Sequence, residues 1–98
     1  MKILALEKEI PGATVEAFQL YLKAEAQRVW ELQQSGALRE IHFRADQHTA
    51  VLVLECADIE DARHLLATLP LVQAGLITFD LFPLIPYDGY ARLFAQPG

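Results

Sequence analysis

Hydrophobic and polar residues repeat along the chain with two different periods. Four short segments either alternate residue by residue or are apolar on both sides, as strands do. Two longer segments between them repeat apolar residues at helical spacing. The predicted strands are Lys2–Glu9, Ala37–Ala45, Ala50–Ala57 and Leu76–Pro83, and the predicted helices run from Thr14 to Ser35 and from Asp58 to Pro70.

Polar residues and a glycine mark the ends of the two helices. Thr14 is placed to cap the first helix, and Gly36 is a natural residue just beyond its end. Asp58 precedes the second helix, and Asp61 follows three residues later, a weaker form of the capping box. These signals predict where each helix begins and ends.

The predicted order is strand, helix, strand, strand, helix, strand. Right-handed crossovers place both helices on one face of a four-stranded antiparallel sheet. The sequence therefore predicts an α+β protein of the ferredoxin-like βαββαβ fold, with residues 1–98 as a single domain and residues 84–98 as a C-terminal tail. Since Ala50–Ala57 is apolar on both sides, we expect the uncovered sheet face to meet a second copy in a homodimer.

A carboxylate lies within the apolar face of the first helix. At about 100° per residue, Glu25 falls in the middle of this face. A partly desolvated carboxylate is suited to act as a general base. The alternative is that the helix is rotated, or that Glu25 pairs with an arginine at the dimer contact. The apolar residues of this face are Phe18, Tyr21, Leu22, Val29 and Leu32.

Three further segments carry a resemblance to a known family. They are "ELQQSGAL" (31–38), "LLATLPL" (65–71) and "FPLIP" (82–86). With them the chain resembles the dimeric α+β barrel proteins, and it is most similar to the muconolactone isomerase group. The resemblance implies a homodimer or a larger ring of dimers, a pocket between sheet and helices, and proton transfer on a lactone without a cofactor. Glu25, eleven residues before Gly36, occupies the position of a glutamate of that group.

Other residues complete the predicted site. His42 is a second catalytic candidate, because histidine exchanges protons near neutral pH, although an interface or exposed histidine is the alternative reading. Phe18, Tyr21 and Leu22 flank Glu25 and are predicted to bind substrate. Arg92, in the tail, is placed to hold a substrate carboxylate if the tail packs over its own pocket or over a neighbouring subunit.

Composition excludes several classes of function. The formal net charge is -5 and no basic run occurs, which argues against nucleic acid and anionic membranes as partners. One cysteine and three histidines without ligand spacing argue against disulfides and metal sites. No glycine-rich phosphate loop is present, so no nucleotide cofactor is expected. Without a signal peptide or a membrane span, we expect a cytoplasmic protein.

The leading hypothesis is a small cofactor-independent enzyme. It would carry out muconolactone isomerase-like proton transfer on a lactone or enol-type carbonyl compound, with Glu25 as the base. Two alternatives stay open. One is a cofactor-free monooxygenase of the same fold, and the other is a non-catalytic module that binds a small ligand or drives oligomerisation.

Overall fold

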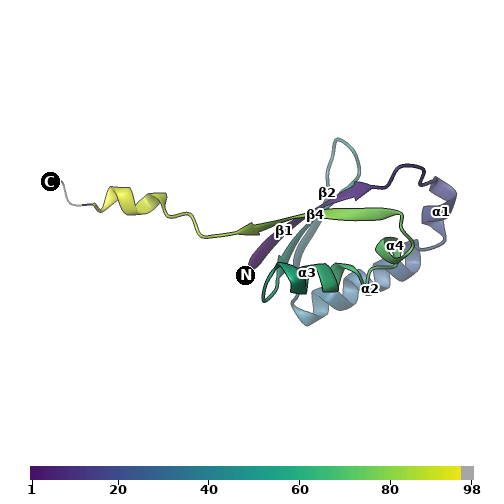
Figure 1. Cartoon of the computed structure of the whole chain (residues 1–98), viewed down its shortest axis with the longest axis horizontal. Helices are drawn as coiled ribbons and strands as arrows, with labels where there is room; N and C mark the ends of the chain where they lie inside the picture. The colour runs from purple at the N-terminus through teal and green to yellow at the C-terminus, as the bar shows by residue number, and fades with distance from the viewer. Residues whose placement is uncertain (96–98) are drawn as a thin grey trace.

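The computed structural model describes residues 1–95 and has the predicted α+β architecture, with one antiparallel sheet and helices gathered on one side of it (Figure 1). The strand order is β2-β3-β1-β4, which is the order of the ferredoxin-like fold. The elements are β1 (Lys2–Glu9), α1 (Val15–Gln19), α2 (Leu22–Ser35), β2 (Leu38–Phe43), β3 (Ala50–Glu55), α3 (Ile59–Leu66), α4 (Pro70–Gln73), β4 (Ile77–Leu84) and the 3₁₀ helix η1 (Gly89–Leu93).

The strand register defines two different sheet faces. Residues directly opposite each other in an antiparallel pair point to the same side of the sheet. Ala5 lies opposite Leu52 on β3 and Leu81 on β4, and all three point toward the helices. Leu6 lies opposite Val51 and therefore points to the other, uncovered side.

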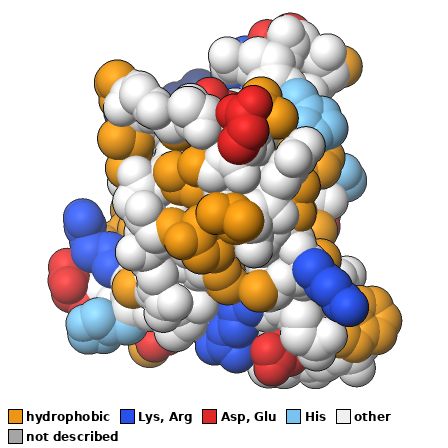
Figure 2. All heavy atoms as spheres, turned by 90° about the vertical axis from the view of Figure 1, so that its right-hand side faces the viewer, with side chains coloured by type: hydrophobic (Ala, Val, Ile, Leu, Met, Phe, Trp, Pro, Cys, Tyr) orange, Lys and Arg blue, Asp and Glu red, His pale blue; other side chains and the backbone are white. Residues whose placement is uncertain are grey.

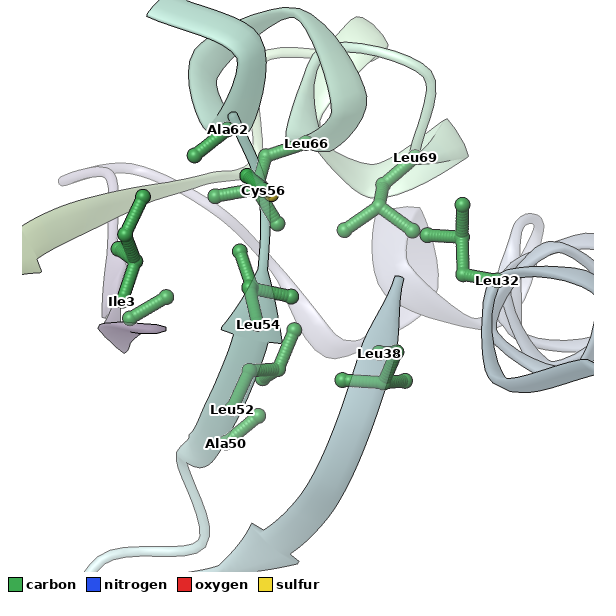
Figure 3. Packing of buried hydrophobic residues seen from close by; sticks show 11 residues of the cluster. Ile3, Leu32, Leu38, Ala50, Leu52, Leu54, Cys56, Ala62, Leu66 and Leu69 are labelled. Carbon is green, nitrogen blue, oxygen red and sulfur yellow. The ribbon is translucent and has the colours of Figure 1, made fainter. Parts of the chain in front are cut away.

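The hydrophobic core fills the space between the sheet and the helices (Figure 3). Ile3 and Leu54 are fully buried on the sheet side, and Leu32 of α2 and Leu66 of α3 belong to the same buried cluster from the helix side. Removing such side chains from water is the main favourable contribution to folding. The core also includes Ala5, Leu38, Ala50, Leu52, Cys56, Ala62 and Leu69.

The capping roles predicted for Thr14, Gly36 and Asp58 are confirmed. The Thr14 hydroxyl accepts a hydrogen bond from the Ala17 N–H at 3.2 Å, and Gly36 ends α2 in the left-handed conformation at φ 85°. Asp58 accepts from the Asp61 N–H at 2.8 Å and so caps α3. The Asp61 carboxylate reaches back to the Ala57 N–H at 2.9 Å, so the two aspartates cap the helix reciprocally.

The prediction of one continuous first helix is wrong. The chain makes a tight turn between α1 and α2, where the Tyr21 N–H donates to the Phe18 carbonyl at 2.9 Å. This bond spans three residues, whereas an α-helical bond spans four. The turn shifts the helical phase, so Leu22 is 51% exposed and does not lie on the buried stripe. No glycine or proline marks the turn in the sequence.

The prediction that Pro70 ends the second helix needs a smaller correction. α3 already ends at Leu66, and Pro70 begins the short helix α4. Proline suits the first position of a helix because the N–H it lacks has no helical partner there.

A bulge near Arg39 also displaces the register between β2 and β3 by one residue.

The uncovered face of the sheet is largely apolar at its centre. Leu4, Leu6, Val51 and Val53 lie on it and are only half-buried, and Phe82 next to them is 46% exposed. Within residues 1–95, no helix has the length and apolarity needed to cross a membrane.

The C-terminal arm, residues 85–95, extends away from the sheet and helices (Figure 1). It continues the line of β4 and gives the chain extents of 64 × 29 × 21 Å. The one described ring contact in the arm is internal, an edge-to-face pair of Tyr87 and Tyr90 with centroids 4.9 Å apart. Ile85 is 85% exposed and Phe94 is 80% exposed. The arm therefore does not cover its own subunit.

Candidate active site

Glu25 lies in the first turn of α2, on the side that packs toward the other helices. Its side chain is half-buried, and its Oε1 accepts a hydrogen bond from the Leu71 N–H at 2.9 Å. Burial raises the pKa of this carboxyl above its ordinary value, and the hydrogen bond from Leu71 lowers it in part. The sequence thus located a carboxylate that is partly withdrawn from water.

The contact with Leu71 also has a structural role. α4 begins after Leu69, which offers no side-chain cap, so the first N–H groups of the helix need other acceptors. Glu25 supplies one of them. One turn further along α2, the Arg28 Nε donates to the Thr68 hydroxyl at 2.9 Å. The two contacts fasten α2 to the segment that leads into α4.

Glu7 is a second half-buried carboxylate that the sequence analysis missed. It follows Ile3 and Ala5 on the helix side of β1, in a row whose first two members are fully buried. Its Oε1 accepts a hydrogen bond from the Ala50 N–H at 3.3 Å, just past the last paired residues of β1 and β3. A strict application of strand alternation to Lys2–Glu9 would have placed Glu7 with the core residues.

The pKa of Glu7 is also raised. Burial is the largest cause, and the negative charges of Glu9 and Glu25 add to it. The hydrogen bond from Ala50 and the charge of His48 act in the opposite direction. Burial therefore sets the direction of the shift, and the neighbouring charges are smaller contributions.

A cavity of about 530 Å³ lies between β1 and the β2–β3 hairpin, and Glu7 forms part of its wall. Thr49 lines the same cavity, and its hydroxyl is buried with no hydrogen-bond partner among residues 1–95. An unpaired buried hydroxyl costs roughly 1–3 kcal/mol, so a ligand or a small rotation that satisfied it would be favourable. The other lining residues are Leu6, Lys8, Glu9, Arg44, Gln47 and Asp80.

A second cavity, of about 230 Å³, lies against α1. Phe18 and Leu22, both predicted to bind substrate, line it together with Glu9. Figure 2 views the molecule from the end that carries α1 and shows hydrophobic side chains gathered near the centre of this face, with an acidic side chain beside them. Tyr21, the third predicted contact, is half-buried, and its carbonyl accepts the Glu25 N–H at 2.8 Å.

The structure does not bring His42 or Arg92 to Glu25 within one subunit. His42 lies opposite Val51 on the uncovered sheet face, where it is exposed and pairs with Glu40 at 3.3 Å. Arg92 lies on η1 in the exposed arm. Both residues remain candidates only for a site to which a second subunit contributes.

Several other charged groups have local partners. Asp80 lies 3.3 Å from Lys8 on the uncovered face. Arg44 is held by Asp46, which lowers the pKa of that carboxyl. Cys56 is buried, and burial raises the pKa of its thiol, which suits a core residue better than a nucleophile. Among residues 1–95, no group of three His, Cys, Asp or Glu side chains is arranged to hold a metal ion.

Comparison with known proteins identifies the fold. A structure of muconolactone isomerase superposes with a TM-score of 0.70 and 18% identity over 90% of this chain and 92% of that one. A 5-chloro-2-hydroxyhydroquinone dehydrochlorinase from Burkholderia phenoliruptrix, solved in complex with 2,5-dihydroxybenzoquinone, superposes with a TM-score of 0.69 and 14% identity over 91% and 98% of the two chains. No protein-family model and no curated protein matches the sequence.

At these identities the likeness establishes the fold. The chain has the ferredoxin-like α+β fold seen in muconolactone isomerase, over nearly the whole length of both proteins. The resemblance stated from the sequence is confirmed at this level. Superfolds of this kind host many unrelated activities, so the activity has to be argued from the side chains of the site.

Proposed function

We propose that this protein is a small cofactor-independent enzyme that transfers a proton on a lactone or enol-type carbonyl compound, with Glu25 as the base. The observation that carries the proposal is the half-buried Glu25 carboxyl with its raised pKa. A base whose pKa is raised toward neutrality removes a proton more effectively than an ordinary exposed carboxylate. The fold shared with muconolactone isomerase supports this choice of reaction class.

The hydrogen bond from Leu71 positions the base. It engages Oε1 of Glu25, so the described hydrogen bonds leave Oε2 for a substrate. In the reaction, Glu25 takes a proton from the carbon next to the carbonyl, and the electrons of the broken C–H bond move into an enolate. Return of a proton to the far end of the enolate completes a shift of the double bond. This removal and return of a proton requires no electron acceptor and no metal.

The chemistry of the two similar structures points to the size of the substrate. One is named for a lactone, and the other was solved with a dihydroxybenzoquinone. Both are small oxygenated ring compounds. The cavity beside Glu7, about 530 Å³, lies within the usual range for small-ligand pockets, although Glu25 is not among the residues that line it.

We further propose that the active form is a homodimer or a ring of dimers. The apolar uncovered sheet face and the exposed arm both favour burial against a second copy. In such an assembly the arm of one subunit would lie over another subunit, and Arg92 would reach a site that its own subunit cannot provide. Arg92 would then hold a substrate carboxylate.

A second candidate is a small-ligand-binding module without catalytic activity. The contact between Glu25 and Leu71 favours it, because this carboxylate already has a structural task as the acceptor for α4. Under this reading Glu25 would hold α4 in place, and the cavities would only bind a ligand.

Proton NMR of muconolactone in D₂O with the purified protein tests the proposal. We expect the wild type to isomerise the lactone with uptake of solvent deuterium. Glu25→Gln keeps an oxygen for the Leu71 N–H and should lower the rate about 100-fold or more. Glu31→Gln, an exposed residue of the same helix, is the matched control and should retain the wild-type rate.

The outcomes separate the two candidates. Full turnover by a folded Glu25→Gln variant would exclude Glu25 as the base. Binding of muconolactone or 2,5-dihydroxybenzoquinone by the wild type without isomerisation or deuterium exchange would favour the binding module.

A further inference from the structure

A third cavity, of about 250 Å³, lies between the strand β4 and the helices α3 and α4. Figure 1 shows these two helices on the same side of the sheet. β4 is the last strand in the order β2-β3-β1-β4, so the cavity is at one edge of the layer between sheet and helices. Glu25 does not line it, and the inference is therefore independent of the proposed function.

The walls of this cavity are mainly apolar and come from all three elements. Phe79 and Leu81 point to the helix side of the sheet, because Leu81 lies opposite Ala5. Both side chains are only half-buried, so they still present apolar surface to water. An apolar occupant would remove this surface from water, which is favourable. The apolar lining residues are Leu66, Ala67, Val72, Phe79 and Leu81.

Arg63 is the one charged residue that lines this cavity among residues 1–95. Its Nε lies 3.2 Å from Oε1 of Glu60, one turn earlier on α3, and both side chains are more than half exposed. Such an exposed ion pair is weak. Because Glu60 meets Nε, the two terminal nitrogens of the guanidinium keep their N–H groups for another acceptor. Thr78 also borders the cavity, but it lies opposite Lys8, and its hydroxyl points away from the helices.

We propose that this cavity binds a small aromatic carboxylic acid, with its ring among the apolar side chains and its carboxylate on Arg63. An apolar pocket with one convergent polar group is the usual composition of a small-molecule site. A guanidinium matches the two oxygens of a carboxylate, and the Phe79 ring suits contact with a second ring. A phosphate would require more donors than this lining offers.

The size of the cavity limits the ligand to a single ring. Its volume of about 250 Å³ is just below the roughly 300–1,000 Å³ of pockets that take drug-sized molecules. Benzoate is therefore a suitable probe, and benzamide has a ring of the same size without the negative charge. Since the guanidinium is the one charged group of the lining, we expect the cavity to prefer benzoate to benzamide.

NMR titration of the ¹⁵N-labelled full-length protein with benzoate tests the proposal. We expect saturable shifts of the Ala67, Val72 and Phe79 amide signals, with a dissociation constant of about 1 mM or lower. Benzamide should bind at least about 10-fold more weakly, because it lacks the charge that strengthens hydrogen bonds to a guanidinium. The same spectra show whether each variant below is folded.

Four variants separate binding at Arg63 from general effects of charge. Arg63→Gln should raise the dissociation constant for benzoate about 10-fold or more, whereas Lys23→Gln, which removes one exposed positive charge from α2, should leave it unchanged. Glu60→Gln should lower it by up to about 5-fold, because it frees Arg63 from a competing carboxylate. Ala67→Leu keeps Arg63 but fills part of the cavity, and it should also weaken binding.

Three results would overturn the proposal. The first is the absence of saturable shifts at these amides in the wild type. The second is equal affinity for benzoate and benzamide. The third is wild-type affinity for benzoate in a folded Arg63→Gln variant, which would show that the carboxylate does not bind Arg63.

Discussion

The helix-covered side of the sheet and the C-terminal arm use the same residue types in opposite environments. Leu54, on the covered face, is fully buried, whereas Leu93, in the arm, is 75% exposed. Ile3 and Ile85 show the same contrast, at 0% and 85% exposure. The covered face is stable through contacts within one chain. The arm has apolar side chains that only another surface can remove from water.

This difference separates the features that one chain forms by itself from the features that require a second copy. The covered face includes Glu7 and Glu25, each held by a backbone N–H of the same chain. Arg92 belongs to the arm and contributes to no site in its own subunit. The placement of these two carboxyl groups therefore depends on the fold of one chain, and the proposed role of Arg92 depends on assembly.

The largest expected effect comes from removing the arm. Deletion of residues 85–98 removes five large exposed side chains of the described arm, each of which contributes roughly 1.5–3 kcal/mol when it is buried. If the arm packs on a second copy, we expect the dissociation constant for self-association to rise by about 100-fold or more. Sedimentation velocity across a concentration series measures this change. The five side chains are Ile85, Tyr87, Tyr90, Leu93 and Phe94.

A full-length variant controls for the shortened chain. Ile85→Ser combined with Phe94→Ser should weaken self-association in the same direction, although less than the deletion does. Unchanged self-association in both variants would show that the arm is not the contact, and would leave the uncovered sheet face as the remaining candidate.

The second prediction compares one substitution in each region. Leu54→Ala should lower the free energy of unfolding by about 2–5 kcal/mol, because it leaves a cavity in the core. Ile85→Ala should change it by less than about 0.5 kcal/mol under conditions in which the chain is monomeric. Urea denaturation at low protein concentration measures both. Equal losses would mean that the arm packs on its own subunit in solution.

The sequence predicted the covered region well. A short apolar segment near the N-terminus identified β1 to the residue, and local capping residues such as Asp58 and Gly36 marked helix ends. These features depend on neighbours within a few positions, which a sequence displays directly. The turn between α1 and α2 was missed because the sequence has no glycine or proline there.

The candidate site was predicted only in part. Glu25 was found because a carboxylate interrupts an apolar helical face. Glu7 was missed because β1 ends in "EKE", which resembles a solvated strand end, and its burial depends on strand pairing and on α2. His42 has the right chemistry, but the register places it on the uncovered face. Long-range register decides which polar residues meet, and local patterns do not encode it.

The third prediction concerns local capping in the covered region. Asp58→Ala should lower the free energy of unfolding by about 1 kcal/mol, because it removes the acceptor for the Asp61 N–H. Thermal unfolding followed by circular dichroism measures the loss. Asp88→Ala is the matched control in the arm, where Asp88 precedes η1 without a side-chain capping bond, and it should have little effect. A comparable loss in both variants would point to a general charge effect.

The smallest expected effect is the pH dependence of stability due to Glu7. Its pKa is higher in the folded state than in the unfolded chain, so the folded state binds the proton more tightly. The stabilisation from this proton is fully present below the unfolded pKa and is lost as the pH rises through the folded pKa. Glu7→Gln stays neutral and keeps an oxygen for the Ala50 N–H. It should therefore be more stable than the wild type at pH 7, with a difference that shrinks toward pH 4.

Urea denaturation at a series of pH values from 4 to 8 measures this difference. Glu31→Gln reports the effect of removing an exposed negative charge from a chain that already carries a net charge of -5. A Glu7→Gln variant that is less stable than the wild type at pH 7 would show that the ionised carboxylate stabilises the fold. The half-buried carboxylate would then be a structural acceptor for β3. A gain in stability at pH 7 would instead show that the fold holds Glu7 at a cost, as expected of a residue placed for chemistry.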